Sequence, residues 1–234
     1  MKTLIIIPAF NEEENIIHLI NKIKNISNSH KYDILVINDK SKDKTSDICK
    51  GLGVNIIDLP CNLGIGGAVQ TGYKYAQKNN YEIAIQVDGD GQHNPEYLDD
   101  LIKPIEESEA DIVIGSRFIK FAGFQSSALR RIGIRYLKTL INILSREKIT
   151  DPTSGFRAVN RKIIDIFAEY YPRDYPEPES IMVIKRKMLT VKEIPVIMNE
   201  RESGISSINF TRSIYYMIKV TLAIVFDKMR KDYV

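Results

Sequence analysis

The sequence is poor in cysteine, nearly balanced in charge and free of long apolar runs. Two cysteines, Cys49 and Cys61, occur among the 234 residues and have no metal-binding spacing, so we expect free thiols in a reducing compartment. The net charge of +3 is too small to indicate a protein that binds nucleic acid. With 44% apolar and 27% charged residues, the composition is that of a globular protein, and the length suits one domain with an appendage.

No apolar run is long enough to be a secretory signal or a membrane span. The run at residues 4–7 is stopped by Pro8, and the run at 214–226 is interrupted by Lys219, whereas a helix needs about 20 apolar residues to cross a bilayer. We therefore expect a cytoplasmic chain whose residues 210–234 form an amphipathic helix. That helix is expected to pack on the domain, to dock on a partner or to lie on a membrane surface.

Two common nucleotide-binding motifs are missing. No G-x-G-x-x-G follows the first apolar run, and no G-x-x-x-x-G-K-[ST] loop occurs anywhere, which excludes dinucleotide-binding and Walker-type NTPase sites. The glycines at 64–67 come instead after the third expected strand, at the start of a helix. A helix N-terminus that admits a neighbouring backbone or a phosphate group remains open there.

Short apolar stretches alternate with helical patterns through residues 1–117. This alternation predicts an α/β fold with a doubly wound, mostly parallel sheet, with the first helix starting at Asn11 and strands at 3–7, 32–38, 55–59, 81–87 and 111–117. The second half is expected to contain a basic helix around 130–138, a helix at 161–168, irregular chain at 170–178 because of its prolines, a helix at 179–188 and a strand at 191–197. We expect one catalytic domain, 1–209, followed by the C-terminal helix, 210–234.

Acidic side chains follow three of the expected strands. Glu12 follows the first strand, Asp39 the second, and Asp88 and Asp90 the fourth, while Arg117 ends the fifth. Because the carboxyl ends of parallel strands meet at one edge of a sheet, these side chains are expected to converge. A single acid after a strand is usually a helix cap. The set as a whole indicates a site for a nucleotide and a metal ion.

The two aspartates are two residues apart on one short turn. Gly89 lies between Asp88 and Asp90, and Gly91 follows them, so a metal-bound phosphate can approach the backbone without meeting a Cβ atom. Two carboxylates placed in this way suit Mg²⁺ or Mn²⁺ bridging a diphosphate. By itself the motif is more typical of an ordinary Asp-Gly turn, and the metal interpretation depends on the acids around it.

Seven segments of the chain form an ordered set of motifs: PAFNEEEN, INDKSKDKT, NLGIGGAVQTGY, VDGDGQHNPE, VIGSRF, DPTSGFRAVNR and EIPVIMNERESGISS. Taken in this order, they resemble family 2 glycosyltransferases of the GT-A fold. The similarity is nearest to the branch of dolichol-phosphate mannose synthases and polyprenyl-phosphate glycosyltransferases, and it covers residues 3–209. The common order of the segments is far more specific than any one of them.

The resemblance implies roles for individual residues. It implies that Asp39 reads the base, that Asp88 contacts ribose and metal, and that Asp90 is the main metal ligand, assisted by Gln92. The implied nucleotide-binding set is Pro8, Ala9, Glu12, Asp39, Gly66, Gly67, Asp88 and Gln92, and the implied metal set is Asp88, Asp90 and Gln92. The implied catalytic set is Asp90, Arg117, Arg131, Arg157, Glu179 and Arg201, in which the arginines meet the sugar diphosphate or the acceptor phosphate. Glu179 is equally well explained as a first-turn helix acid.

The chain departs from the family pattern at several positions. Asn38 replaces the first acid of the loop after the second strand, Lys40 replaces its glycine, and Ile65 replaces a lysine of the glycine-rich loop. The segment at 201–207 lacks both lysines of its family counterpart. The last change removes two positive charges expected near the acceptor phosphate, so it affects the expected acceptor more than the expected donor.

The function implied by the resemblance is transfer of a sugar, with inversion, from a nucleotide-diphosphate sugar to a polyprenyl phosphate, with Mg²⁺ or Mn²⁺ as cofactor. Two alternatives remain. One is transfer to a hydroxyl of a lipid-linked saccharide, for which Glu179 would be the base, and the other is a non-catalytic partner of a membrane glycosylation complex. Peripheral association with the inner face of the membrane is expected, through the final helix and its basic end or through a small membrane-protein partner. A homo-oligomer remains open.

Overall fold

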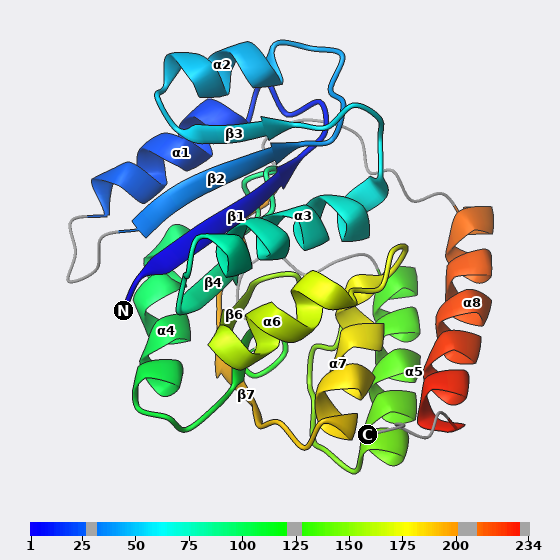
Figure 1. The fold of residues 1–234 in the computed structure, drawn as a ribbon. Helices are drawn as coiled ribbons and strands as arrows, with labels where there is room; N and C mark the ends of the chain where they lie inside the picture. Colours follow the sequence, from blue (N-terminus) through cyan, green and yellow to red (C-terminus); the bar gives the residue numbers. More distant parts are fainter. Residues whose placement is uncertain (27–31, 121–127, 201–209, 230–234) are drawn as a thin grey trace.

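The computed structural model describes residues 1–26, 32–120, 128–200 and 210–229. Its centre is a seven-stranded sheet with strand order β3-β2-β1-β4-β6-β5-β7 (Figure 1). Only β6 runs antiparallel to its neighbours, β4 and β5. The strands are β1 (Thr3–Ala9), β2 (Tyr32–Asn38), β3 (Asn55–Asp58), β4 (Ile83–Gln86), β5 (Ile112–Ser116), β6 (Arg157–Asn160) and β7 (Val191–Pro195).

Helices cover both faces of this sheet. One apolar core lies between the sheet and α1, α2 and α4, and the other lies between the sheet and α3, α6 and α7. Helices α5 and α8 extend the second layer beyond the sheet (Figure 1). The helices are α1 (Ile16–Asn25), α2 (Thr45–Gly51), α3 (Gly64–Lys78), η1 (Pro95–Tyr97), α4 (Leu98–Glu106), α5 (Ala128–Ser145), α6 (Arg161–Glu169), α7 (Pro176–Arg186) and α8 (Phe210–Met229).

The central strands are buried on both faces, as a continuously apolar strand requires. Every residue of β1 is buried, and β1 pairs in parallel with β2 and with β4. The β1–β2 register places Ala9 beside Asn38, so the loops that follow these two strands leave the sheet at the same edge. The predicted doubly wound, mostly parallel sheet is confirmed.

The strand β6 was not predicted from the sequence. It is four residues long and follows a turn-rich segment, so no alternating pattern marks it. It enters the sheet antiparallel between β4 and β5, pairing Gln86 with Arg157 and Ile114 with Arg157. This insertion brings the segment at 151–157 next to the end of β4.

Two predicted helix starts are wrong. Helix α1 begins at Ile16 rather than at Asn11, because Asn11 has a positive φ of 56°, outside the conformation of a helix N-cap. The N–H of Glu12 donates to Thr45 Oγ1, which ties this turn to the start of α2. Helix α7 begins at Pro176, inside the segment predicted to be irregular. Proline is tolerated in a first helical turn because the N–H groups there have no partner within the helix.

Helix α8 packs on the domain through one face. Val220 and Ile224 are buried against the layer formed by α5 and α7, and Arg186 of α7 forms an ion pair with Asp227 at 2.6 Å. Within the described parts of the chain, no helix is long and apolar enough to span a membrane. The division into a domain at 1–209 and a separate helix at 210–234 remains a prediction.

Candidate active site

The loops after β1 and β4 lie against each other at the carboxyl edge of the sheet. The N–H of Gly89 donates to the carbonyl of Pro8 at 3.3 Å. A Cβ atom on Gly89 would lie 3.0 Å from that carbonyl oxygen and 3.5 Å from Ala9 Cβ and from Glu12 Cγ. The absence of a side chain at Gly89 therefore allows Pro8, Ala9 and Glu12 to border the loop that carries Asp88 and Asp90.

Asp39 joins this edge to the start of α3. Its N–H donates to the carbonyl of Ala9 at 2.9 Å, and its carboxylate accepts the N–H of Leu63 at 2.6 Å and of Gly64 at 2.9 Å. The carboxylate thus compensates the positive end of the α3 dipole. Each carboxylate oxygen can accept a further hydrogen bond, so Asp39 can also receive an N–H from a ligand.

The loop between α6 and α7 packs against the first turn of α3. The N–H of Gly66 donates to the carbonyl of Arg173 at 3.1 Å, and a Cβ atom on Gly66 would lie 2.2 Å from the same oxygen. A Cβ on Gly67 would meet Leu63 Cβ at 2.5 Å. The glycines at 66 and 67 are therefore required for close packing, whether or not a nucleotide lies over them.

Asp88 is held on both sides by polar side chains. Its N–H donates to Nδ1 of His93 at 3.0 Å, and its Oδ1 accepts Nε2 of Gln86 at 3.0 Å. The ring of His93 is buried and stacks on Phe156 with a centroid distance of 4.8 Å. A Cβ atom on Gly155 would lie 3.1 Å from Asp88 Oδ2 and 2.8 Å from Gln86 Nε2. Three neighbours, Gln86, His93 and Gly155, therefore limit the position of Asp88.

Two charged side chains, Glu177 and Arg157, lie near Gln86. The side chain of Gln86 also bonds to Glu177, whose pKa is raised by burial, lowered by the nearby charge of Arg157 and raised again by Asp88. Arg157 is 1% exposed and donates to the carbonyls of Ser154 and Pro152 and to Ser180 Oγ. Arg157 thus supplies a buried positive charge next to the acids rather than a guanidinium open to solvent.

Asp90 and Gln92 complete the turn after β4. Asp90 Oδ1 accepts the N–H of Gln92 at 3.1 Å, and Gly91 has a positive φ of 76° that favours glycine. The carbonyl of Gln92 accepts the N–H of Asn199 at 2.9 Å. Asp90 is thereby oriented by its own turn, and the turn is anchored to the chain after β7.

The aspartate pair fits a divalent metal ion that takes its remaining ligands from a substrate. Among the described residues, no cluster of three or more His, Cys, Asp or Glu side chains could hold a metal alone. Mg²⁺ and similar ions are commonly bound by one or two carboxylates together with substrate phosphates and water. The carboxylates of Asp88 and Asp90, with Gly89 and Gly91 beside them, form such a partial ligand set.

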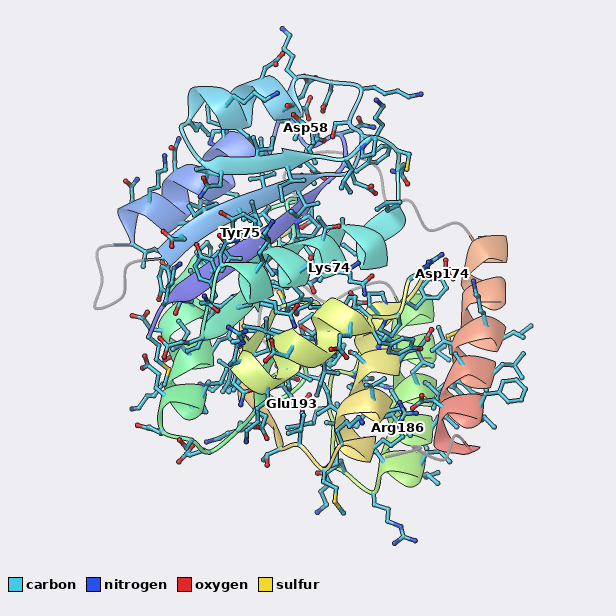
Figure 2. All side chains as sticks on the ribbon, viewed as in Figure 1. Asp58, Lys74, Tyr75, Asp174, Arg186 and Glu193 are labelled. Carbon is cyan, nitrogen blue, oxygen red and sulfur yellow. The ribbon has the colours of Figure 1, made fainter. Side chains whose placement is uncertain are left out.

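Arg117 is held by a buried aspartate. It forms a bidentate ion pair with Asp151, in which Nε donates to Oδ2 at 2.6 Å and Nη2 donates to Oδ1 at 2.7 Å. Arg117 also donates to Thr153 Oγ1 at 2.9 Å. Burial is the largest single influence and lowers the pKa of Arg117. The hydrogen bonds with Asp151 and the negative charges of Asp151, Asp88 and Glu177 together exceed it, so the pKa of Arg117 is raised. Glu193 of β7, labelled in Figure 2, holds the same loop by accepting the N–H groups of Thr150 and Asp151.

Two residues of the predicted catalytic set, Arg131 and Glu179, lie on α5 and α7, and a third, Arg201, is not described. Arg131 is half-buried on α5, and Arg201 lies outside the described residues. Glu179 lines a cavity of about 280 Å³ between α7 and α8, together with Val183 and Asp227. Burial first, and then the charge of Asp174, raises the pKa of Glu179 to about 7. The acid of α7 that interacts with Asp88 is Glu177, two residues earlier.

Four neighbours of Asp88 were not identified from the sequence: Gln86, His93, Gly155 and Glu177. One signal was available for Gln86 in the sequence, because it is a polar residue at the end of an apolar strand; the structure shows that it is fully buried. His93 lies five residues after Asp88, but its spacing matches no known ligand pattern. Gly155 and Glu177 reach the site only through the tertiary fold.

The sequence comparisons decide the family. Residues 4–167 match the model described as Glycosyl transferase family 2.

The chain belongs to glycosyl transferase family 2.

Two curated relatives of this family 2 glycosyltransferase cover most of its length. A UDP-N-acetylglucosamine–dolichyl-phosphate N-acetylglucosaminyltransferase of Methanococcus voltae is 31% identical over 82% of this chain and 83% of the relative. A dolichol-phosphate mannosyltransferase of Pyrococcus furiosus is 30% identical over 94% of this chain, which spans 64% of that relative. The resemblance to the polyprenyl-phosphate branch of the family is confirmed.

The fold of this glycosyltransferase also matches solved structures. Glucosyl-3-phosphoglycerate synthase from Mycobacterium tuberculosis, solved with Mn²⁺, UDP and phosphoglyceric acid, superposes with a TM-score of 0.76 over 99% of this chain and 80% of that one. The identity is 15%, so this likeness bears on the fold alone. The predicted GT-A architecture is confirmed.

Proposed function

We propose that this glycosyltransferase moves a sugar from a nucleotide-diphosphate sugar to a polyprenyl phosphate, with inversion at the anomeric carbon. The observation that carries the proposal is that Glu12, Asp39, Asp88 and Asp90 lie at one sheet edge, on loops that contact one another through Pro8, Ala9 and Gly89. That arrangement suits a nucleoside diphosphate and a metal ion. The names of both curated relatives specify a dolichyl phosphate acceptor.

The donor would lie across the carboxyl ends of β1, β2 and β4. Asp39, at the start of α3, would receive an N–H of the base, and Asp88 would face the ribose. Pro8, Ala9 and Glu12 would form one wall, with Gly66 and Gly67 opposite. Ligands commonly bind in this crevice of an open parallel sheet.

Asp88 and Asp90 would hold a divalent metal ion, either Mg²⁺ or Mn²⁺, with Gln92 assisting. Such an ion supplies Lewis-acid stabilisation of the charge that develops on a leaving diphosphate. Arg117 and Arg157 contribute fixed positive potential beside Asp88, because their positions are set by Asp151 and by neighbouring carbonyls. Preorganised charges of this kind need little rearrangement during the reaction.

A phosphate acceptor fits the position of Glu179 on α7. An oxygen of polyprenyl phosphate is already anionic near pH 7, so attack on the anomeric carbon requires no general base. The carbon–oxygen bond to the diphosphate then breaks as the new bond forms on the opposite face. A hydroxyl acceptor would need a base in the site, whereas Glu179 lines the cavity between α7 and α8.

The enzyme would work where its acceptor is found. A polyprenyl phosphate is anchored in a bilayer by its chain, so we place this glycosyltransferase peripherally on the inner face of the membrane, with a small membrane-protein partner as an alternative means of attachment. A homo-oligomer is compatible with this location.

The decisive assay measures sugar transfer to undecaprenyl phosphate and dolichyl phosphate. A thermal-shift screen of UDP-, GDP- and dTDP-sugars with Mn²⁺ first selects the donor, since a bound ligand raises apparent stability by mass action. Asp90→Ala is expected to abolish metal-dependent transfer, while Asp100→Ala, an exposed aspartate of α4, leaves it unchanged. Transfer to lipid-linked saccharides only would contradict the proposed acceptor, and equal transfer by Asp90→Ala would contradict the metal site.

A further inference from the structure

Helices α5 and α8 share a large apolar surface that the domain does not cover. We define the α5–α8 face by six exposed side chains: Ile132, Tyr136, Ile143, Ile218, Leu222 and Phe226. Ile143 is 69% exposed and Phe226 is 63% exposed. These values are high for large apolar side chains within helices that are otherwise packed on a core.

The six side chains form two neighbouring stripes. On α8, Ile218, Leu222 and Phe226 follow one another at intervals of four residues, so they lie on one side of the helix. Val220 and Ile224 occupy the opposite side and are fully buried. Helices α5 and α8 run side by side (Figure 1), and the hydroxyl of Tyr136 on α5 lies 3.2 Å from Thr221 Oγ1 on α8. The stripes therefore join into one surface.

The charge on this surface is almost entirely of one sign. Helices α5 and α8 together contain a single acidic residue, Asp227, and its carboxylate is paired with Arg186 of α7. Arg131, Arg135 and Lys138 lie along α5 beside the apolar stripe, and Arg135 is exposed. An apolar face flanked by cationic side chains is typical of helices that bind anionic lipid surfaces.

The charge pattern disfavours a second copy of the chain as the occupant. A two-fold dimer through this surface would place the same patch of each copy against the other. The arginines and the lysine of both α5 helices would then approach one another, with no carboxylate on either helix to compensate them. Anionic headgroups supply that compensation.

The α5–α8 face adjoins the active-site edge. Lys219 of α8 forms an ion pair with Asp174, which is labelled beside α8 in Figure 2. The adjacent residue, Arg173, accepts the N–H of Gly66 at the start of α3. One short loop thus connects α8 to the wall of the proposed donor site, so a surface seated on the α5–α8 face would lie near the rim of the site.

We propose that the α5–α8 face seats this enzyme on an anionic lipid bilayer, with its six apolar side chains among the headgroups and acyl chains and with Arg131, Arg135 and Lys138 on the lipid phosphates. The biological role of this surface rests on the proposed function, because an enzyme that uses a polyprenyl phosphate embedded in a bilayer must reach that bilayer. The surface itself is argued from exposure and charge.

Binding to protein-free vesicles tests the surface. The full chain is sedimented with vesicles of phosphatidylcholine and phosphatidylglycerol, and with vesicles of phosphatidylcholine alone. We expect binding to the anionic vesicles that weakens as salt is added. Leu222→Glu with Phe226→Glu is expected to lower this binding by about tenfold or more, and Arg135→Glu is expected to lower it by about tenfold. The matched control is Met188→Glu, at a residue that is 91% exposed and lies outside the face.

A pair of acceptors separates this proposal from the proposed function. The Leu222→Glu/Phe226→Glu variant is expected to keep transfer to a short, water-soluble prenyl phosphate and to lose transfer to undecaprenyl phosphate in vesicles. If the wild-type chain binds anionic vesicles but uses neither acceptor, the proposed function fails and the surface stands. Failure of the wild-type chain to bind anionic vesicles, equal binding by the double variant, or a dimer that the double variant dissociates would overturn the lipid surface.

Discussion

The main-chain N–H of Asp88 donates to Nδ1 of His93 across 3.0 Å, and Nε2 of the same ring lies 3.6 Å from the Asp88 carboxylate. Because Nδ1 accepts a hydrogen bond, the neutral ring carries its proton on Nε2, on the side of the carboxylate. Stacking on Phe156 fixes the plane of the ring. The His93 ring therefore anchors the backbone of Asp88 and places its Nε2–H near, but not in hydrogen-bond contact with, the Asp88 carboxylate.

Replacing His93 by alanine is expected to weaken metal binding and sugar transfer by about 10- to 100-fold, the usual effect of removing a side chain that orients a metal ligand. The N–H of Asp88 would lose its partner, so the backbone that carries the carboxylate would be anchored less firmly, with Gln86 still bonded to Oδ1. Mn²⁺ titration and initial rates measure the effect. His18→Ala, at an exposed position of α1, is the control, and an unchanged Mn²⁺ affinity in His93→Ala would refute the positioning role.

Gly155→Ala is expected to lower activity because its Cβ atom would lie 2.8 Å from Gln86 Nε2 and 3.1 Å from Asp88 Oδ2. Both side chains must then move, and the donor site moves with them. Gly51→Ala, at the end of α2 with no atom within 4 Å of its Cβ, is expected instead to stabilise the chain by about 0.5 kcal/mol. Michaelis constants for the donor and thermal melts of both variants provide the comparison. Normal donor binding by Gly155→Ala would show that the space around Asp88 is not limiting.

Asp151→Asn is expected to destabilise the fold by about 3 kcal/mol, since it leaves the buried cation of Arg117 without its charged partner. Asp151 is 0% exposed, and it accepts both prongs of the guanidinium. Urea denaturation measures the loss. The equivalent change in the exposed pair of Arg161 and Asp165, Asp165→Asn, is expected to cost about 0.5 kcal/mol or less. Equal costs for the two variants would mean that burial does not strengthen the Arg117–Asp151 pair.

Glu179 predicts a pH dependence of stability. Burial and then Asp174 raise its pKa from 4.5 to about 7, against the opposing charge of Lys219 and with further contributions from Asp227 and Glu177. Between these two pH values the folded chain holds a proton that the unfolded chain has released, so this residue lowers stability as the pH rises. Glu179→Gln is expected to raise the melting temperature at pH 8 and to leave it unchanged at pH 4.

The control for this pH effect is Glu14→Gln, at an exposed glutamate of the turn before α1. Its melting temperature is expected to follow that of the wild-type chain throughout. A Glu179→Gln variant that shows no gain at pH 8 would mean that the carboxyl ionises without cost in the cavity between α7 and α8. The same variant is expected to transfer sugar at the wild-type rate, whereas a large loss of transfer would favour Glu179 as a base.

Much of the architecture could be predicted from local patterns. The strand at 32–38 and the helix that begins at Gly64 have the predicted bounds, because strongly periodic or continuously apolar segments admit few alternatives. The start of α7 and the strand β6 could not be predicted in this way. Pro176 is compatible with both a loop and a first helical turn. The four residues of β6 form a strand through their antiparallel pairing with β4 on one side and β5 on the other, which no local pattern reveals.

The candidate site could also be predicted only in part from local patterns. Asp88 and Asp90 were identified from the sequence because acidic residues also follow the first two expected strands and Arg117 ends the fifth, so the set indicates more than an ordinary turn. Their supporting residues come from distant segments, and no local pattern marks Gly155 or Glu177 as neighbours of Asp88. The predicted roles of all these site residues, including those of Arg131, Arg201 and Glu179, remain predictions.

The sequence by itself determined the alternating α/β order, the sheet edge at which the acids gather and the family to which the chain belongs. These features follow from residue type and spacing, which act over short stretches of chain. Only the tertiary structure decided that His93 and Gln86 hold Asp88, that Arg117 is bound by Asp151, and that one side of α8 is buried while its other side stays exposed beside α5. Those relationships depend on contacts between distant segments, and such contacts form only when the sheet and its helices are assembled.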